Sequence, residues 1–433
     1  MRRWARAGAG AVLALCAVAA LATPSQAEPA PDDRAVELKR NAGPPAGAVR
    51  AVHQSEPARI TSYWTARRMR RARPLELLLD RPPQGGRASS AAPARPALHQ
   101  GFNRFELADT TSFPNRTHGQ VFFTLPGERD FTCSGTVVTA NSHSVVLTAG
   151  HCIHDGGAGS GFATNWIFVP GYRDGSRPFG EWPAARLTST AGWVEGANFS
   201  FDVGAAVVAR NANGQGIQDV VGARGIAFNR PRDQLYRSFG YPAGRPALGF
   251  DGERAFACDS GYGGDDATTS PPQTMVIGCD MDVGASGGAW VAGGSVVSSV
   301  NSYKYVLEPD HIYGPYFGPA VESFHETVGG PPILCRGRAV TQLGGDGPDA
   351  FTGTVGPDVF LTGRGADRIV AADGQDRACA GRGPDAILAQ EGEDLVSAGR
   401  GRDTVKGGPG KDECNGGRGR DRASGCERRR RFP

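Results

Sequence analysis

Short apolar runs separated by turn residues fill the middle of the chain, between Gly101 and about Gly330. The runs are rich in β-branched and aromatic residues, and Gly, Pro, Asn and Asp interrupt them. No stretch of convincing length follows a helical period. Many short strands with turn signals between them are typical of an all-β sandwich or barrel domain. The predicted strands lie within residues 120–125, 134–139, 144–149, 165–170, 202–208, 274–279 and 294–300.

A second pattern, with a strict period of nine residues, runs from Gly344 to Ser424. In all nine units the fourth residue is Gly and the sixth is Asp. Such a period predicts a solenoid, in which stacked units share one narrow core; we place it at residues 344–426, between a linker at 331–343 and a basic tail at 427–433. The eighth positions are predicted to fill this core: Phe351, Phe360, Ile369, Ala378, Ile387, Val396, Val405, Cys414 and Ala423.

The N-terminal part has neither pattern. Residues 1–27 combine early arginines, an apolar stretch and a small-x-small end at Ala27, which predicts a secretory signal peptide. A membrane anchor is the alternative, but about 14 apolar residues fall short of the roughly 20 that span a bilayer. Residues 28–100 are rich in Pro, Ala and Arg and poor in aromatic residues, so we expect a pro-segment or disordered linker, or merely a solvated exported tail. The mature product is expected to be secreted and extracellular, with no stable membrane anchor.

The net charge bears on a nucleic-acid partner, and the number of cysteines bears on disulfide bonds. The formal net charge of +3 over 433 residues gives no argument for a nucleic-acid partner. Removing Cys16 with the signal peptide leaves eight cysteines. An even number in an exported chain predicts disulfides, although the count alone leaves their pairing open.

Three motifs in the β-rich region carry candidate chemistry, in the order His, Asp, Ser. They are TAGHC at Thr148–Cys152, NFSFDVGAAVV at Asn198–Val208 and CDMDVGASGGAWV at Cys279–Val291. Acyl transfer by a serine needs a base, an acid that orients the base, and backbone N–H groups that meet the oxyanion. The glycines around Ser286 suit the last requirement, because a tight loop that aims two amides at one point needs backbone freedom.

With these motifs, residues 121–300 resemble the trypsin-like (chymotrypsin-fold) serine peptidases, nearest to the bacterial glutamyl-endopeptidase-like branch. The resemblance implies two antiparallel six-stranded β-barrels within a domain spanning 101–330, with the active site in the cleft between them. It also implies that His151 is the general base, Asp202 its orienting partner and Ser286 the nucleophile, and that the amides of Gly284 and Ser286 form the oxyanion hole. The resemblance also implies that the substrates are proteins or peptides.

Several alternatives stand beside this assignment. His154 reads as a loop residue, and Asp174 and Asp219 compete with Asp202 for the role of orienting acid. Ser286 follows Ala285, whereas trypsin has an aspartate there that receives the new N-terminus on activation. Asp280 lies at the offset of the basic-residue selector of trypsin, or is simply a loop acid. No histidine occurs in Ser295–Tyr303, where a glutamyl-reading one is expected, so the cleaved side chain stays unassigned.

Disulfide pairs follow from the same resemblance. It implies that Cys133 pairs with Cys152, next to His151, closing a loop of about 20 residues worth roughly 3 kcal/mol. Cys258 with Cys279 is the expected second pair. Cys335 with Cys379 and Cys414 with Cys426 are what remain, although the sequence leaves the pairing of these four cysteines open.

The nonapeptide unit resembles the RTX, or haemolysin-type, repeat, which stacks as a parallel β-roll and binds Ca²⁺ through oxygen ligands. Arg occupies the third position of four units, so several sites are expected to be weak or empty, and a metal-free spacer is the alternative. Without calcium, the stacked carboxylates should keep the repeats disordered. Cell-surface or matrix contacts through the repeats are a further expectation. The predicted sixth-position ligands are Asp349, Asp358, Asp367, Asp376, Asp385, Asp394, Asp403, Asp412 and Asp421.

The sequence therefore predicts a secreted serine endopeptidase with a calcium-stabilised repeat module. The alternative, from a different functional class, is an exported calcium-binding adhesive protein in which the peptidase-like domain is an inactive scaffold.

Overall fold

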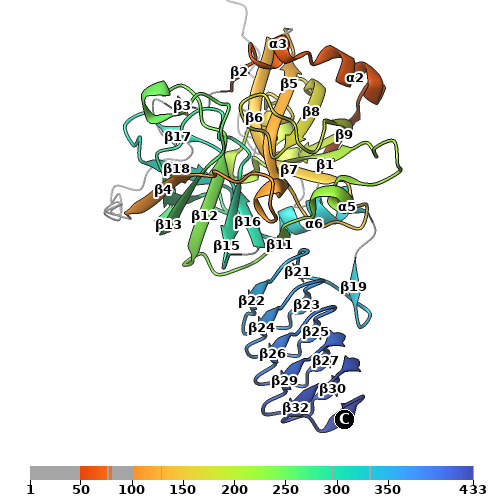
Figure 1. Cartoon of the computed structure of the whole chain (residues 1–433). Helices are drawn as coiled ribbons and strands as arrows, with labels where there is room; N and C mark the ends of the chain where they lie inside the picture. Colours follow the sequence, from red (N-terminus) through yellow and green to blue (C-terminus); the bar gives the residue numbers. More distant parts are fainter. Residues whose placement is uncertain are drawn as a thin grey trace, which may run out of the picture. The chain divides into compact units, whose positions relative to one another are not determined.

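A computed structural model describes residues 49–75, 78–79, 101–127, 129–294, 296–330 and 333–432. The predicted signal peptide and the rest of the predicted pro-segment lie outside these residues. In the described part, strands dominate and helices are few and short (Figure 1). No described helix is both long enough and apolar enough to cross a membrane.

The first barrel is a closed sheet of six antiparallel strands. Its hydrogen-bonded order is β8-β5-β6-β7-β10-β9, and β9 pairs back with β8 to close it. The strands contain the β-branched and aromatic runs seen in the sequence, and nearly every residue of β5 is buried. The strand bounds are β5 His118–Leu125, β6 Arg129–Val137, β7 Val145–Thr148, β8 Thr164–Pro170, β9 Trp182–Thr190 and β10 Gly204–Val208.

The second barrel follows the order β18-β14-β13-β12-β15-β16. Hydrogen bonds that join Ser302 and Tyr303 to Tyr313 link the end of β16 to β18. β11 then adds to β16 in parallel, and β4 pairs with β13. The bounds are β4 Phe102–Glu106, β11 Gly225–Ala227, β12 Leu235–Gly240, β13 Phe256–Asp265, β14 Met275–Gly278, β15 Ala289–Ala292, β16 Val296–Val300 and β18 His311–Gly314.

The expectation of a disordered linker is wrong for residues 49–75. These form β1 (Val49–His53), α2 (Pro57–Tyr63), α3 (Ala66–Met69) and β2 (Arg73–Pro74). β1 pairs with β9, β2 pairs with β6, and the side chains of Ile60, Trp64 and Met69 are buried in the core of the first barrel. The segment has too few apolar residues for a core of its own, so it folds by packing on the barrel.

Three further helices were not predicted, because no long helical period marks them. α4 (Ala191–Gly196) and α5 (Ile217–Val221) are single turns or little more. α6 (Pro319–Gly329) is longer and contacts β9 and β10 of the first barrel. Short 3-10 turns complete the domain: η1 Asn115–Thr117, η2 Gly150–Cys152, η3 Phe199–Phe201 and η4 Pro246–Leu248.

The repeats form a parallel β-solenoid with two sheets, as predicted. The eighth-position side chains fill its core; all but that of Ala423, which is partly buried, are fully buried. One sheet contains β21 Gln342–Leu343, β23 Val359–Leu361, β25 Arg377–Cys379, β27 Leu395–Ser397, β30 Glu413–Asn415 and β33 Arg428–Arg430. The other contains β22 Ala350–Thr352, β24 Arg368–Val370, β26 Ala386–Leu388, β29 Thr404–Lys406 and β32 Arg422–Ser424.

The solenoid extends beyond the nonapeptide units at both ends. β21 comes from the predicted linker, and it pairs with β23 on one side and with β11 of the second barrel on the other. β33 comes from the predicted basic tail and forms the last rung on β30. Two shorter pairs flank the sheets: β19 (Leu334–Cys335) with β20 (Arg338–Ala339), and β28 (Arg400–Gly401) with β31 (Arg418–Gly419).

Four disulfides connect the cysteines in the predicted pairs. They are Cys133–Cys152, Cys258–Cys279, Cys335–Cys379 and Cys414–Cys426. The first two lie in the barrels, and the third joins the β19–β20 hairpin to the solenoid. The disulfide predictions are therefore confirmed.

Candidate functional site

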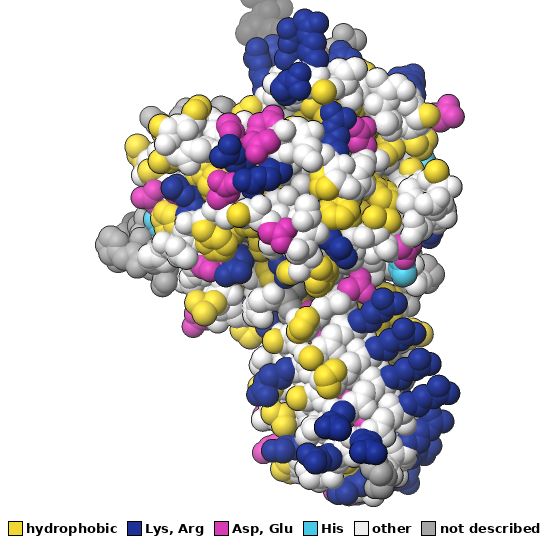
Figure 2. Space-filling view, in the orientation of Figure 1, with side chains coloured by type: hydrophobic (Ala, Val, Ile, Leu, Met, Phe, Trp, Pro, Cys, Tyr) yellow, Lys and Arg dark blue, Asp and Glu magenta, His cyan; other side chains and the backbone are white. Residues whose placement is uncertain are grey.

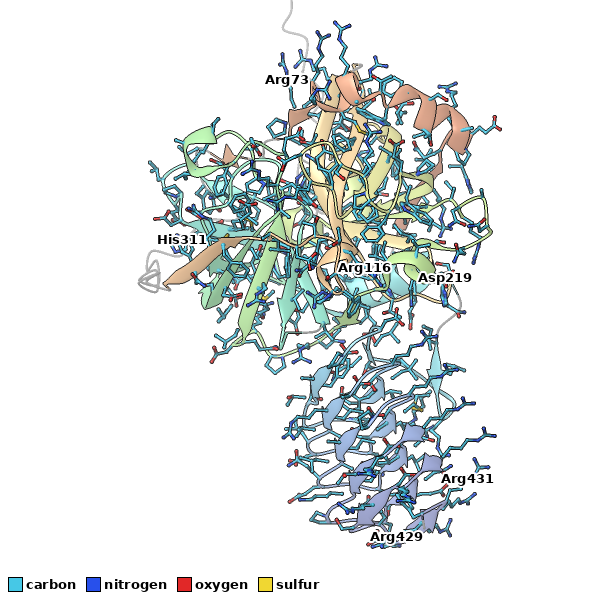
Figure 3. The ribbon with its side chains drawn as sticks, viewed as in Figure 1. Arg73, Arg116, Asp219, His311, Arg429 and Arg431 are labelled. Carbon is cyan, nitrogen blue, oxygen red and sulfur yellow. A yellow bond between two sulfur atoms is a disulfide. The ribbon has the colours of Figure 1, made fainter. Side chains whose placement is uncertain are left out.

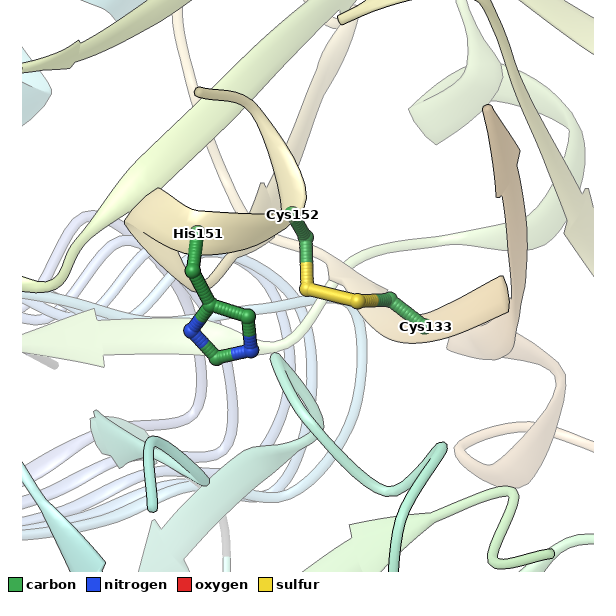
Figure 4. Close-up of side chains that lie close together, drawn as sticks. All are labelled: Cys133, His151 and Cys152. Atoms are coloured by element: carbon green, nitrogen blue, oxygen red, sulfur yellow. A yellow bond between two sulfur atoms is a disulfide. The ribbon is translucent and has the colours of Figure 1, made fainter. Parts of the chain in front are cut away.

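His151 sits immediately after the first-barrel strand β7. All four residues of β7 are buried, and the chain then turns through η2, which contains His151 itself. The disulfide from Cys152 to Cys133 ties this turn to β6 (Figure 4). The sulfurs of this pair are bonded to each other, so the cluster of Cys133, His151 and Cys152 does not offer two free thiolates to a metal.

Asp202 binds the ring and the backbone of His151. Its Oδ2 accepts a hydrogen bond from His151 Nδ1 at 2.8 Å, and its Oδ1 accepts one from the His151 amide at 2.8 Å. Ser302 Oγ donates a third hydrogen bond, to Oδ2, at 2.5 Å. Asp202 is fully buried, so these contacts hold the carboxylate in one orientation. Ser302 was not predicted; it lies in the segment inspected for a histidine, as the second residue after β16.

The two competing aspartates have other partners. Asp219, on α5, binds the Nδ1 atom of His143 at 2.6 Å, and Figure 3 shows it at the edge of the first barrel beside α5. Asp174 pairs with Arg254. Of the three candidates, only Asp202 contacts His151. His154 is also buried, and its Nδ1 accepts the amide of Gly156 at 3.0 Å, so this ring has a local structural contact.

The loop that carries Ser286 lies against the strand that leads to His151. Gly284 and Gly287 have positive φ angles of 90° and 79°, which side chains rarely adopt. A Cβ at Gly287 would also lie 2.0 Å from Thr148 Oγ1. The Ser134 amide donates to the Ser286 carbonyl at 2.7 Å, and Ser134 Oγ donates to the Gly284 carbonyl at 2.9 Å. These glycines therefore permit the close approach of the two barrels.

Polar atoms without partners converge on this region. Among the described residues, His151 Nε2 is buried and has no hydrogen-bond partner. The amides of Gly284 and Ser286 likewise donate to no described residue, although their neighbour Ala285 donates to the Asp282 carbonyl at 3.1 Å. One proton acceptor on the His151 turn and two donors on the Ser286 loop are thus without described partners, and no hydrogen bond joins Ser286 Oγ to His151 Nε2.

A small cavity beside Ser286 is lined by second-barrel residues, including Val283, Ala285 and Lys304. Lys304 Nζ donates to the Met281 carbonyl at 2.8 Å and to that of Pro309 at 2.5 Å, and burial lowers its pKa to about 8. Asp280 is not part of the cavity wall, and its carboxylate forms an ion pair with Arg104. Of the two readings of Asp280, the geometry favours the loop acid.

The sixth-position aspartates of the repeats form two buried rows. From Asp367 to Asp421, each Oδ1 accepts the amide of the aspartate 18 residues earlier, at 2.7 to 3.1 Å. The second oxygen, Oδ2, is buried and has no described partner in these seven residues. In Asp349 and Asp358, Oδ2 instead accepts an amide N–H, from Gly345 and Thr354.

Burial makes the ionised form of these aspartates unfavourable. It raises the pKa of Asp376 and of Asp385 to about 7, and neighbouring aspartates add to the shift. It raises the pKa of Asp394 and of Asp403 to about 6. Buried carboxylate oxygens without partners, close to backbone carbonyls, are the donor set that Ca²⁺ takes. The residues present therefore fit calcium.

Comparisons with known proteins agree with the two predicted resemblances. The family model of the RTX calcium-binding nonapeptide repeat matches residues 343–387 and 388–423. A curated glutamyl endopeptidase of Bacillus licheniformis is 31% identical over 103 residues, which are 24% of this chain. The match spans 29% of the length of that protein.

Two solved proteases match a larger share of the chain. The protease Anisep from Arthrobacter nicotinovorans is 38% identical, over 52% of this chain and 99% of that chain, with a TM-score of 0.48. A thermostable serine protease from an extremophilic microorganism is 37% identical, over 49% of this chain and 97% of that chain, with a TM-score of 0.46. The RTX match confirms the resemblance of the repeats, and the glutamyl endopeptidase match supports the resemblance of the β-rich region to serine peptidases.

Proposed function

We propose that this chain is a serine endopeptidase that hydrolyses peptide bonds through Ser286, His151 and Asp202. The observation that carries the proposal is the buried His151–Asp202 pair, whose Nε2 atom has no described partner although it is buried. A ring held in this way presents a neutral nitrogen that is available to take a proton. The protease relatives and their sequence identity support a peptidase, and the serine mechanism is our inference from this geometry.

In the proposed mechanism, Asp202 fixes the tautomer of His151. The carboxylate accepts from Nδ1, so the proton resides there and Nε2 is left as the base. Nε2 takes the hydroxyl proton of Ser286 as its Oγ attacks the substrate carbonyl, and it later gives the proton to the leaving amine. The Ser302 hydroxyl and the His151 amide stabilise the charge on Asp202 throughout.

The amides of Gly284 and Ser286 would stabilise the oxyanion. Both are free of described acceptors, and the positive φ of Gly284 sets the direction of this loop. Backbone donors fixed in a folded loop need no reorganisation during the reaction, and losing one such donor costs about 3 kcal/mol in comparable sites. We assign Gly284 to this role together with Ser286.

We further propose that the repeats bind Ca²⁺ through the buried aspartates and stabilise the protein outside the cell. The RTX match and the unpaired Oδ2 atoms support calcium, and the four disulfides support an oxidising compartment. The metal takes no part in the acyl chemistry. Protein or peptide substrates are proposed, without nucleic-acid partners or a stable membrane anchor; cell-surface or matrix contacts through the repeats are proposed as well.

The test is covalent labelling of the full chain with a fluorophosphonate probe. We expect label on the wild type, none on Ser286→Ala, and strongly reduced label on His151→Ala. Ser62→Ala changes an exposed serine far from the site and serves as the matched control. Equal label on wild type and Ser286→Ala would refute the assignment. A chain that binds calcium but stays unlabelled even after its N-terminal segment has been cleaved off would favour the alternative of an adhesive protein with an inactive scaffold.

A further inference from the structure

The N-terminal segment continues past β2 into the region of Ser286. Arg73 and Pro74 pair in parallel with Phe131 and Thr132 of β6, and the Leu75 amide donates to the Thr132 carbonyl at 3.1 Å. The start of the segment therefore lies on the first barrel. Its partner Thr132 directly precedes Cys133, whose disulfide reaches the turn that contains His151.

The segment then crosses to the second barrel. Leu75 lines the cavity beside Ser286, and a Cβ on Gly284 would lie 3.4 Å from Pro74 Cβ. Further on, β3 (Leu78–Leu79) pairs in parallel with β17 (Lys304–Tyr305), the strand that follows Ser302. Residues 73–75 thus lie on the first barrel, and residues 78–79 pair with a strand of the second.

The direction of this crossing is opposite to that of a substrate. Resting on the proposed function, the acyl part of a substrate lies on the side of the Ser286 cavity, and the leaving amine lies toward His151, which protonates it. The acyl part is the N-terminal part of a peptide. A substrate therefore runs from the second barrel to the first, whereas residues 73 to 79 run from the first barrel to the second.

We infer that residues 73–75 and 78–79 lie along the substrate cleft in reverse and act as a built-in inhibitor. Leu75 covers the cavity that would receive a substrate side chain, while the reversed backbone presents no carbonyl in the productive orientation. The buried Ile60, Trp64 and Met69 anchor the segment to the first barrel, so it stays in place until residues 49–79 are removed or displaced.

The rate of fluorophosphonate labelling of the full chain tests this inference. Leu75 packs partly buried against the hydrophobic core of the first barrel, and Leu75→Asp puts a charge there; we expect labelling at least tenfold faster than in the wild type. Arg70→Ser, an exposed change in the same segment, should label at the wild-type rate. Intact-mass spectra establish that the N-terminal segment is still attached. Misfolding cannot imitate the expected result, because it slows labelling.

The outcomes separate this inference from the proposed function. Equal rates for wild type and Leu75→Asp, with Ser286→Ala unlabelled, would overturn the inhibitor and leave the enzyme standing. Cleavage on the carboxyl side of Leu75 in the purified chain would overturn the reversed direction. Absence of label in every variant would refute the enzyme, and the inhibitor with it.

A separate observation concerns the outside of the solenoid. Arg364, Arg382, Arg400 and Arg418 occupy the third position of alternate units and stack in register through parallel bridges. All four are exposed, and no ion pair joins them to an acidic residue of the described chain. Figure 2 shows a file of Lys and Arg side chains along one edge of this region. The third positions of the intervening units include Asp373 and Glu391 instead, so the regular row of third-position arginines is found on one edge only.

We propose that this arginine file binds an extended anionic polysaccharide. Successive rungs of a parallel sheet lie about 4.8 Å apart, so the file presents an evenly spaced row of cations that repel one another unless counter-charges lie along it. Single-stranded nucleic acids are bound with the help of exposed aromatic side chains. The aromatic residues Phe351 and Phe360 of the repeats are buried, which favours a polymer without bases.

Retention of the calcium-loaded full chain on immobilised heparin tests this surface. Arg382→Ser with Arg400→Ser should elute at clearly lower salt than the wild type. Arg377→Ser with Lys411→Ser removes the same charge from a separate hollow of the repeats and should elute with the wild type. An equal shift in both double variants, no retention of the wild type, or tighter binding to a single-stranded oligonucleotide than to heparin would each overturn the proposal.

Discussion

Removing calcium should make the stability of the repeats strongly dependent on pH. In the folded solenoid the pKa of Asp376 and of Asp385 is about 7, against an ordinary value of 3.8. Between these values the folded state holds more protons than the unfolded state, so raising the pH lowers the free energy of unfolding. The calcium-free repeats are therefore most stable near pH 4 and lose that stability as the pH rises through 7.

The size of the effect follows from the shifts. Three pH units correspond to about 4 kcal/mol for a group fully removed from water. The solenoid is thin, so water screens its carboxylates. We therefore halve this value, to a loss of about 2 kcal/mol in the free energy of unfolding for each of these two residues. Asp394 and Asp403, with pKa values near 6, add somewhat less. The total is comparable with the whole stability of a small domain.

Calcium should reverse this dependence, because it binds the ionised carboxylates. The assay is thermal unfolding of the Ser286→Ala chain, followed by circular dichroism at pH 5 and pH 8, with calcium or with a chelator. With the chelator, the repeat transition should fall sharply or vanish at pH 8; with calcium it should be restored. Asp385→Asn should raise the chelator midpoint at pH 8, whereas the exposed Glu391→Gln should not. A midpoint with the chelator that is equal at both pH values would refute the reasoning.

Three further outcomes are expected. Ser302→Ala removes one of three hydrogen bonds to Asp202 and should lower kcat/KM about 10- to 100-fold with KM little changed; an unchanged kcat would contradict this role. Trp64→Ala should lower the free energy of unfolding by about 3 to 5 kcal/mol, measured by urea titration in the Ser286→Ala background, and a loss below 1 kcal/mol would mean that the N-terminal segment is not anchored there. Replacing Cys133 and Cys152 together by Ser should cost about 3 kcal/mol in the same titration, and no loss would show that the loop needs no staple.

Much of the fold could be predicted because its signals are local in sequence. Period-nine glycine and aspartate mark the solenoid, and the short β-branched runs mark the barrel strands. His151 and Asp202 lie next to apolar strands, which is why their motifs could be recognised before the structure brought them together. The pairs Cys133–Cys152 and Cys258–Cys279 were predicted from the family resemblance alone, because the cysteine count leaves the pairing open.

The failures have a common physical cause, which is burial against a distant part of the chain. Residues 49–75 look too polar to fold, and they fold only because the first barrel supplies the apolar surface that covers Trp64. The buried apolar side chains of α6, such as Val321 and Phe324, are too few to reveal a helix without the barrel that they contact. Ser302 becomes relevant only through Asp202, which is 100 residues away.

The placement of β11 has a consequence for dividing the molecule. This strand covers the first rung of the solenoid, β21, which otherwise presents unpaired amides and carbonyls along a sheet end. At the other end, β33 carries Arg428, Arg429 and Arg430, and such a cluster of like charges hinders pairing with a second molecule. A fragment that lacks the barrels keeps the arginine-rich strand β33 at its C-terminal end. Its first strand, however, is no longer covered by β11. Such a fragment should add strand to strand and aggregate, whereas the intact chain is protected by its own peptidase-like domain.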